Sequence, residues 1–249
     1  MKSACTASIL LQLFTISHTV AEDSSTATGI SRSFNPEISV NGQMIACWDS
    51  KSSAGSGADG EEHEHGHGAG EGNGMRLQGV EVRMTSVVDP YLQADLILAL
   101  PGGESMELEE GYVTTRNLPA NLLLRAGKQL ALIGRHNQLH PHQFPFVESP
   151  LVYDNVLGGG PVNETGVSLG FLLPTSNYME LTAQALNGNN ELFGSEDGDD
   201  LLYVGHLTGF WDLAEDATLE VSGSYARGIN GRDKRSSLTG IDVKVKWQQ

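Results

Sequence analysis

The chain has 249 residues, which is enough for one large domain or two small ones. It carries 31 acidic and 15 basic residues, so its formal net charge at pH 7 is −16. We therefore expect no nucleic-acid partner, because binding to phosphate groups requires a basic surface. An acidic surface suits a protein that faces cations or lipopolysaccharide, but soluble acidic proteins share this property.

The first 21 residues have the order of regions that is typical of a secretory signal peptide. Lys2 precedes a largely apolar stretch at 7–16, and small residues end at Ala21, after which we expect cleavage. Cys47 would then be the one cysteine of the mature chain, so we expect no internal disulfide. The alternative is a misassigned start codon followed by a chance apolar run. Residues 22–33 are polar and are expected to form a disordered periplasmic segment.

From Phe34 onward the apolar residues recur with a period of two, which predicts strands and not helices. The last segment is the clearest case, and the apolar residues of its first face are Ile241, Val243, Val245 and Trp247. Its second face carries the polar residues Asp242, Lys244 and Lys246. No run of 18 apolar residues follows the signal peptide, so a closed barrel is the remaining way for this sequence to span a membrane.

We predict ten antiparallel strands from this pattern. They lie at 34–48, 76–87, 92–100, 105–115, 122–130, 163–173, 178–186, 201–211, 218–226 and 238–247. Most have the roughly 9–11 residues that a tilted strand needs to cross the hydrocarbon core, whereas soluble strands are usually nearer 5–6 residues. The predicted fold is all-β, an antiparallel transmembrane β-barrel of porin type over residues 34–249. A soluble sandwich or a lipocalin-like barrel is the alternative, since both also alternate.

The predicted connections alternate between short turns and long loops, as in outer-membrane barrels, where the periplasmic turns are tight. The long ones are 49–75, 131–162, 187–200 and 227–237, and 101–104 breaks the rule. This alternation predicts a periplasmic N-terminus and a location in the outer membrane of a Gram-negative cell. Aromatic residues near strand ends are candidates for interfacial girdles: Trp48, Tyr91, Tyr178, Phe210, Trp211, Tyr225 and Trp247.

The loop at 49–75 is rich in histidine and is the first candidate metal site. Its potential ligands are His63, His65, His67, Glu62 and Glu64. Imidazole and carboxylate groups suit borderline divalent ions such as Zn²⁺, and their close spacing in a flexible segment allows them to wrap one ion. The alternative is a solvated acidic loop in which the histidines have no role.

The loop at 131–162 is much longer than a usual connection, and such loops are often functional. Its apolar residues predict that it packs against the barrel lumen, and they are Phe144, Phe146, Leu151 and Tyr153. His136, His140 and His142 are candidates for a constriction or a second metal site. The alternative is that these histidines cap the backbone of the loop itself.

This region also carries a family resemblance. The motifs that show it are Leu124-Arg125-Ala126-Gly127-Lys128, Ile133-Gly134, His136-Asn137, His140-Pro141-His142, Pro150-Leu151-Val152-Tyr153 and Leu157-Gly158-Gly159. They resemble a family of porin-like outer-membrane proteins that are often labelled zinc-regulated TonB-dependent outer-membrane receptors. The resemblance runs from Phe34 to the end and implies a porin-type barrel with a link to zinc supply.

Two features of the chain depart from that family. A TonB-dependent receptor has a plug domain before its barrel, and only 22–33 separates the signal peptide from the first predicted strand, so we expect no plug. Barrels of this kind usually end on an aromatic residue, whereas this chain ends Trp247-Gln248-Gln249. We therefore expect a larger, even-numbered barrel that is truncated at the C-terminus.

The sequence favours a passive pore for small polar solutes or metal ions. The charged residues expected to line its lumen are Glu81, Arg83, Asp95, Glu180, Glu220 and Lys244. The second hypothesis is a receptor that captures zinc through the first loop, with zinc bound but not catalytic. No nucleophile or zinc-protease motif is present, so we expect no enzyme. The expected partners are outer-membrane lipid and lipopolysaccharide, and a homo-oligomer is a further candidate assembly.

Overall fold

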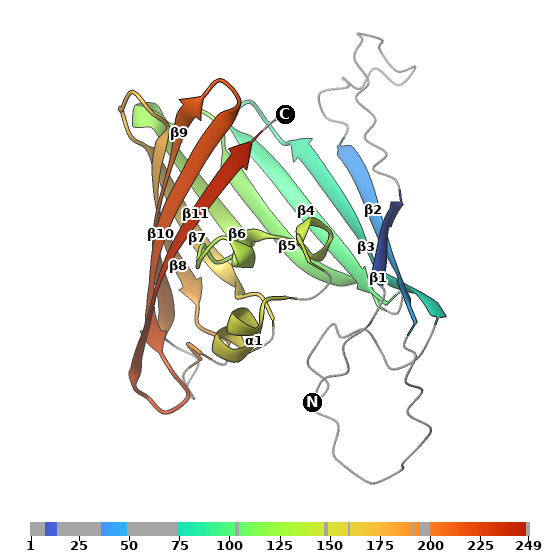
Figure 1. The fold of residues 1–249 in the computed structure, drawn as a ribbon. Helices are drawn as coiled ribbons and strands as arrows, with labels where there is room; N and C mark the ends of the chain where they lie inside the picture. The colour runs from blue at the N-terminus through green and yellow to red at the C-terminus, as the bar shows by residue number, and fades with distance from the viewer. Residues whose placement is uncertain are drawn as a thin grey trace.

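One antiparallel sheet dominates the computed structural model, which describes residues 8–13, 36–48, 74–102, 105–146, 149–158, 160–190, 192–194 and 200–247 (Figure 1). Each strand pairs with the next one along the chain, from β1 to β11. The strands are β1 (Ser8–Leu13), β2 (Glu37–Cys47), β3 (Gly74–Val87), β4 (Leu92–Pro101), β5 (Glu107–Thr115), β6 (Leu122–Leu130), β7 (Asn163–Leu172), β8 (Met179–Asn187), β9 (Leu201–Ala214), β10 (Ala217–Ile229) and β11 (Arg235–Trp247).

Strands β2–β11 confirm the ten strands predicted from the period-two pattern, and all pair antiparallel. The additional strand, β1, pairs with β2 and lies inside the segment expected to be a signal peptide. The signal peptide stays a prediction. If cleavage occurs after Ala21, β1 is removed and β2 becomes the first strand of the sheet. The first histidine loop and the segment 22–33 lie outside the described residues.

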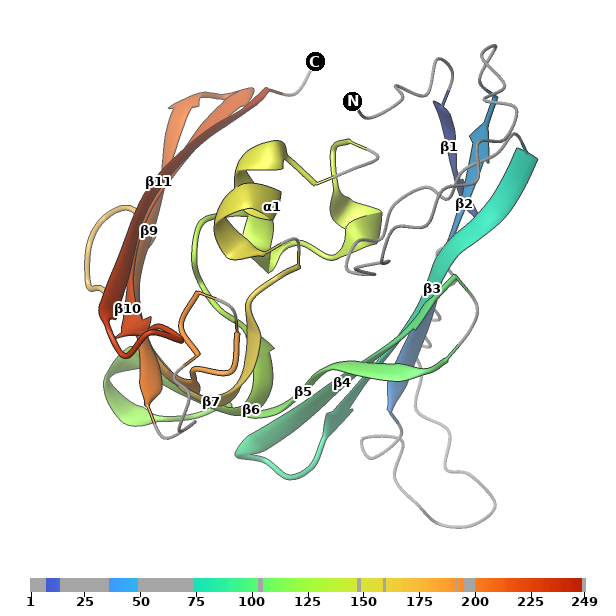
Figure 2. The same cartoon turned by 90° about the horizontal axis from the view of Figure 1, so that it is seen from below.

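The sheet is strongly curved, and the chain between β6 and β7 folds into its concave side (Figure 2). This segment includes the short helix α1 (Leu151–Leu157) and the 3₁₀ turns η3 (His136–Gln138) and η4 (Pro141–Gln143). A further 3₁₀ turn, η2 (Pro119–Asn121), joins β5 to β6. Over the described residues, β11 pairs with β10 alone, so the strand order runs from β1 to β11 without closing. No helix in the described ranges is long and apolar enough to cross a membrane.

The convex face of the sheet is apolar along whole rows of paired residues. One row of register partners crosses β4–β9 and consists of Ala94, Val113, Ala126, Val167, Ala185 and Tyr203. A second row crosses β7–β11 and consists of Phe171, Leu181, Leu207, Gly223 and Ile241. Ile241 is 77% exposed and Leu181 is 46% exposed, so these side chains face outward.

Outside the apolar patch under the loop at 131–162, the concave face is mainly polar, and many of its side chains are buried. The row Glu180, Thr208, Ser222 and Asp242 crosses β8–β11. Buried polar residues of the sheet include Gln43, Asp95, Glu110, Gln129, Glu164, Ser168, Thr182, Gln184, His206 and Ser224. The distribution is therefore opposite to that of a soluble protein, in which polar groups face water and apolar ones are enclosed.

The loop at 131–162 packs against the concave face, as its apolar residues predicted. Its buried side chains Ala131, Ile133, Leu157 and Val162 form a cluster with residues of the strands and of the β8–β9 connection, which are Leu186, Phe193, Leu202, Val204 and Ala226. Tyr153 and Leu157, four residues apart on α1, lie on the side of the helix that faces this cluster.

Part of that packing prediction was wrong. Leu151 is 64% exposed, because it lies on the side of α1 away from the cluster, and Phe146 is 69% exposed. Tyr178 and Phe210, which were predicted to belong to the interfacial girdles, contact each other edge to face and line a pocket on the concave side. Strand alternation explains this, because Phe210 shares a face with the inward residues His206 and Thr208.

Candidate functional site

The side chain of Asn137 closes the loop at 131–162. Its amide nitrogen donates to the carbonyls of Ala131 at 2.7 Å and Val162 at 3.1 Å, and its amide oxygen accepts from the N–H of Val162 at 2.8 Å. The N–H of Ala131 also donates to the carbonyl of Val162 at 2.9 Å. Asn137 is only 2% exposed, so these bonds are protected from water. The two ends of the loop are therefore held side by side.

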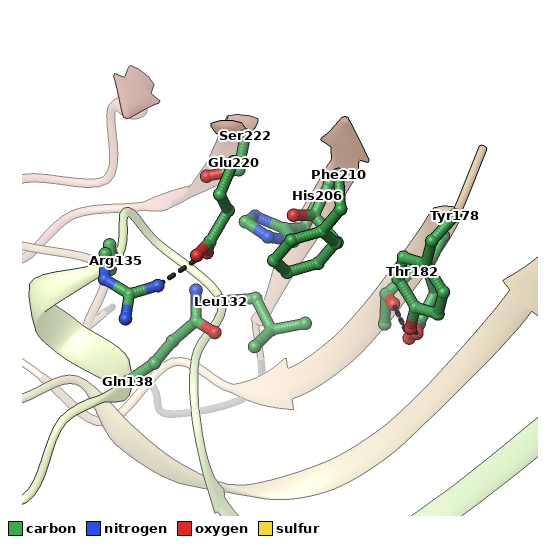
Figure 3. A pocket seen from close by; sticks show the side chains of 11 residues that line it. Leu132, Arg135, Gln138, Tyr178, Thr182, His206, Phe210, Glu220 and Ser222 are labelled. Carbon is green, nitrogen blue, oxygen red and sulfur yellow. Dashed lines mark hydrogen bonds and ion pairs between the residues drawn. The ribbon is translucent and has the colours of Figure 1, made fainter. Parts of the chain in front are cut away.

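One side of the loop is attached to β10 and β11. The N–H of Gly134 donates to Ser224, and the N–H of Arg135 donates to Asp242 at 3.1 Å. The guanidinium of Arg135 forms an ion pair of 2.5 Å with Glu220, which also lies 3.7 Å from the ammonium of Lys244. A pocket of about 270 Å³ lies beside this attachment (Figure 3), and its lining residues include Arg135, Gln138, Tyr178, Glu180, His206 and Glu220.

Gly134 is required at this attachment by its backbone conformation. Its φ is +68°, in the left-handed region, and a Cβ built there would lie 2.5 Å from the hydroxyl of Tyr153. That hydroxyl in turn accepts a hydrogen bond from the N–H of His136. A side chain at position 134 would therefore displace both the turn and the helix that packs on it.

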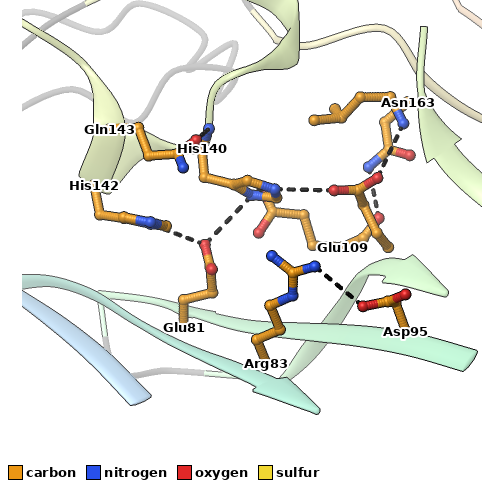
Figure 4. Close-up of polar contacts among 10 residues, drawn as sticks. Glu81, Arg83, Asp95, Glu109, His140, His142, Gln143 and Asn163 are labelled. Atoms are coloured by element: carbon orange, nitrogen blue, oxygen red, sulfur yellow. Dashed lines mark hydrogen bonds and ion pairs between the residues drawn. The ribbon is translucent and has the colours of Figure 1, made fainter. Parts of the chain in front are cut away.

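The other side of the loop is attached to β3 and β5 through the His–Glu cluster, which consists of Glu81, Glu109, Glu110, His140 and His142 (Figure 4). The Nε2 of His140 lies 2.9 Å from a carboxylate oxygen of Glu110. Its Nδ1 lies 3.3 Å from Glu81 and 3.2 Å from Glu109. The Nδ1 of His142 lies 3.1 Å from the same oxygen of Glu81, and the two imidazole rings are stacked with centroids 5.9 Å apart.

A β-bulge explains why two consecutive glutamates reach the same histidine. Glu110 pairs with Ile97 and Leu108 pairs with Leu98, so Glu109 is the extra residue of β5. In a regular strand, neighbouring side chains point to opposite faces, whereas a bulge redirects the extra one. Both carboxylates can therefore contact His140 from the concave side.

The neighbouring ion pair between Arg83 and Asp95 is complete without the loop. Asp95 accepts from Arg83 at 3.1 Å, from Thr85 at 2.7 Å and from Gln93 at 3.1 Å. It is 4% exposed, so its charge is balanced by groups of its own sheet. This arrangement is typical of a structural pair and leaves the cluster as the better candidate for binding.

The cluster changes the protonation of His140. Burial alone would lower the pKa of the His140 imidazole, but the adjacent carboxylates of Glu109 and Glu110, with the charge of Glu81, raise that pKa from 6.5 to about 10. Without a bound metal, His140 is therefore a cation near neutral pH and attaches the loop to three carboxylates.

This shift predicts a pH dependence of stability. Because the pKa is raised in the folded chain, the stabilisation by His140 is complete below about pH 6.5 and is lost as pH rises toward about 10. We expect the difference in unfolding free energy between wild type and His140→Asn to fall steadily across this window. Urea unfolding in detergent with a chelator measures it.

His136 provides the control for that experiment. Burial lowers the pKa of His136 below its usual 6.5, so the neutral imidazole predominates throughout the same window. The difference between wild type and His136→Asn should therefore stay constant. A difference at His140 that is equally constant would contradict the assignment of a charged imidazole.

The structure separates the three histidines that were predicted as one site. His140 and His142 lie in the cluster, but the ring of His136 packs on Phe144 and Tyr153, at 4.3 and 4.7 Å, and lies 3.2 Å from the hydroxyl of Ser149. His136 thus has contacts of its own, and its grouping with the other two as one site stays a prediction. The reason for the separate contacts is that η3 and η4 direct their side chains to different surroundings.

The other predicted site residues fall into two groups. The residues expected to line the lumen lie on the concave side or contact residues there: Glu81, Arg83, Asp95, Glu180, Glu220 and Lys244. That they line a lumen stays a prediction. The candidate ligands of the first loop lie outside the described residues, and they are His63, His65, His67, Glu62 and Glu64.

Sequence reasoning missed Glu109, Glu110, Arg135 and Asn137. The pair Glu109-Glu110 interrupts the alternation of its strand, and this interruption was a signal that could have indicated a bulge. For Arg135 the sequence carries no comparable signal, because its partners are distant in the chain, and for Asn137 no periodic pattern relates the residue to Ala131 and Val162.

Comparison with known proteins shows a similarity to a protein of unknown function. An uncharacterized protein of Aquifex aeolicus (strain VF5) is 37% identical to this chain, in an alignment that covers 69% of the chain and 41% of the relative. The chain thus spans less than half the length of this relative. No family model matches the chain, and no solved structure matches it.

Proposed function

We propose that the chain forms the wall of a porin-type β-barrel in the outer membrane, which passes small polar solutes or metal ions. The reversed polarity of the sheet carries this proposal. Fully burying one Val, Leu or Ile side chain is worth about 1.5–3 kcal/mol, so a belt that exposes such residues on strand after strand favours lipid over water. A soluble sandwich would need a second layer over this belt.

The loop at 131–162 is proposed to narrow the pore. It lies on the concave side and is attached at both sides, through Arg135 to Glu220 and through His140 to Glu110. Loops held inside barrels in this way restrict the size and charge of the solutes that pass. Carboxylates predominate at the His140 attachment, which favours cations, and the family resemblance suggests zinc among them. The long connections would face the cell exterior and the N-terminus the periplasm.

Closure of the barrel is part of the proposal. Among the described residues β11 is a long edge strand, and its convex-face residues Val243 and Val245 are 65% and 59% exposed. Such an edge requires a partner strand, because its unpaired N–H and C=O groups cannot remain in lipid. We propose that further strands, or another copy of the chain, pair with it.

The second candidate function is zinc capture by the loop at 49–75. It is favoured by the three alternating histidines at 63–67 and remains a proposal from the sequence. That the chain is no enzyme also stays a prediction.

Conductance in planar lipid bilayers tests the pore. The refolded chain should produce discrete conductance steps, and a KCl gradient should give a reversal potential of the sign that indicates cation preference. Circular dichroism in detergent checks that the strands have formed. A chain that folds, inserts and closes into a barrel, alone or with another copy, but conducts no current would contradict the pore.

A further inference from the structure

We infer that Glu81, Glu109 and His140 bind a divalent transition-metal ion that joins the loop at 131–162 to β3 and β5. The site differs from the histidine-rich loop and from the predicted group of three histidines, since two of its three ligands are glutamates of the barrel wall. The inference goes beyond the proposed pore, because the ion can bind whether or not the sheet conducts.

The positions of the ligand atoms support this site. One oxygen of Glu81, one oxygen of Glu109 and one ring nitrogen of His140 all lie within 4.8 Å of one another. Small inward movements of the flexible glutamate side chains would bring all three to the 2.0–2.2 Å distances of zinc ligands. Imidazole with carboxylates is a ligand set that suits Zn²⁺ and related ions.

Glu110 orients the imidazole of His140 for metal binding. It accepts a hydrogen bond from the Nε2–H of His140, so the lone pair of Nδ1 points toward the other two glutamates. Among the described residues, the buried Nδ1 has no partner in hydrogen-bond geometry, although the carboxylates of Glu81 and Glu109 lie beside it. Metal-binding histidines commonly donate their second ring N–H to a carboxylate, which sets the tautomer and the ring direction. Glu110 is thus a positioning residue.

The negative charge around the site also favours binding of a cation. Three carboxylates surround one imidazole, and their side chains are 14%, 17% and 8% exposed for Glu81, Glu109 and Glu110. The nearby guanidinium of Arg83 is paired with Asp95. A proton on His140 offsets one negative charge, whereas a divalent ion offsets two. Binding the ion to Nδ1 releases that proton to solvent, which balances the exchange.

Calorimetric titration with Zn²⁺ tests the inference. The full chain, refolded in detergent, is used with His63, His65 and His67 all changed to Ala, so that the first loop contributes no ligand. We expect one Zn²⁺ per chain. His140→Ala, Glu81→Gln and Glu109→Gln should each remove most of the binding, and Glu110→Gln should weaken it by about 10–100-fold.

Glu164→Gln is the matched control. Glu164 is a carboxylate of β7 that is 6% exposed and bonded to Asn189 and Asn190, outside the cluster, so its variant should bind Zn²⁺ as the parent does. His142→Ala shows whether that imidazole or solvent supplies a fourth ligand. Circular dichroism confirms that each variant is folded.

The absorption spectrum of bound Co²⁺ shows whether Glu110 has a positioning role or a structural one. In Glu110→Gln the visible spectrum of bound Co²⁺ should keep the shape seen in the parent, because the ligands are unchanged, while the affinity falls. A folded parent that binds no Zn²⁺ would overturn the site, and so would Zn²⁺ binding that persists in His140→Ala. Equal binding of Ca²⁺ would also overturn it, because it would indicate an acidic cluster alone. A conducting chain without Zn²⁺ binding refutes the site and leaves the pore, whereas Zn²⁺ binding without conductance refutes the pore alone.

Discussion

Replacing Val243 by Arg is expected to lower the free energy of unfolding in a lipid bilayer by about 2–4 kcal/mol, if the residue lies near the midplane. Val243 is 65% exposed on the convex face of β11, next to Val221 of β10. In water, an exposed position of this kind tolerates a charge with little effect, usually within about 0.5 kcal/mol. The size of the change therefore distinguishes a lipid-facing surface from a soluble one.

Lys244→Arg is the matched control for that substitution. Lys244 is the next residue of β11, faces the concave side and lies 3.7 Å from Glu220. Arginine keeps its charge, so the unfolding free energy should hardly change. Both are measured by urea unfolding in phospholipid vesicles. If Lys244→Arg proved the damaging change, the assignment of faces in β11 would be wrong by one residue.

The sheet could be predicted from the sequence because its signal is local and repeated. In a strand, the residues at i and i+2 share a face, so lipid-facing and inward residues alternate within a few positions. Ile241, Val243 and Val245 show this alternation, and the structure places all three on the exposed face. The strand bounds differ from the predicted ones by a few residues, most clearly in β10, which extends to Ile229.

The attachments of the loop could not be predicted, because they depend on the curvature of the whole sheet. Arg135 bonds to Asp242, 107 positions away, and His140 bonds to Glu110, 30 positions away. No periodic pattern relates such pairs. Apolar residues predicted that the loop packs inward, but the ion pairs that hold it required the register of β3, β5, β10 and β11.

The His–Glu cluster shows how one irregularity decides a site. Strict alternation assigns Glu81 to the inward face, and the structure shows that it contacts His140 and His142 there, which was not predicted. The same rule allows only one of Glu109 and Glu110 to face inward, and the bulge of β5 provides both. A local backbone irregularity can thus bring together side chains that a regular strand would place on opposite faces.

Excising the loop at 131–162 is expected to raise the single-channel conductance severalfold. Leu130 and Asn163 are register partners, so an Asn-Gly pair can join β6 to β7 as a two-residue hairpin without changing the strands. The excision removes one half of the apolar cluster, including Ile133 and Leu157, and should lower the unfolding free energy by several kcal/mol.

A single substitution tests whether the position of the loop affects the current while the loop is still present. Asn137→Ala keeps every other residue of the loop but leaves buried groups of Ala131 and Val162 without their partner, at a cost of about 1–3 kcal/mol. The loop should then move within the pore, so the open-channel current should become noisier while its mean rises less than after excision. Planar-bilayer recordings of the three proteins compare them directly. An excised variant that folds and conducts as the wild type does would place the loop outside the path of the ions.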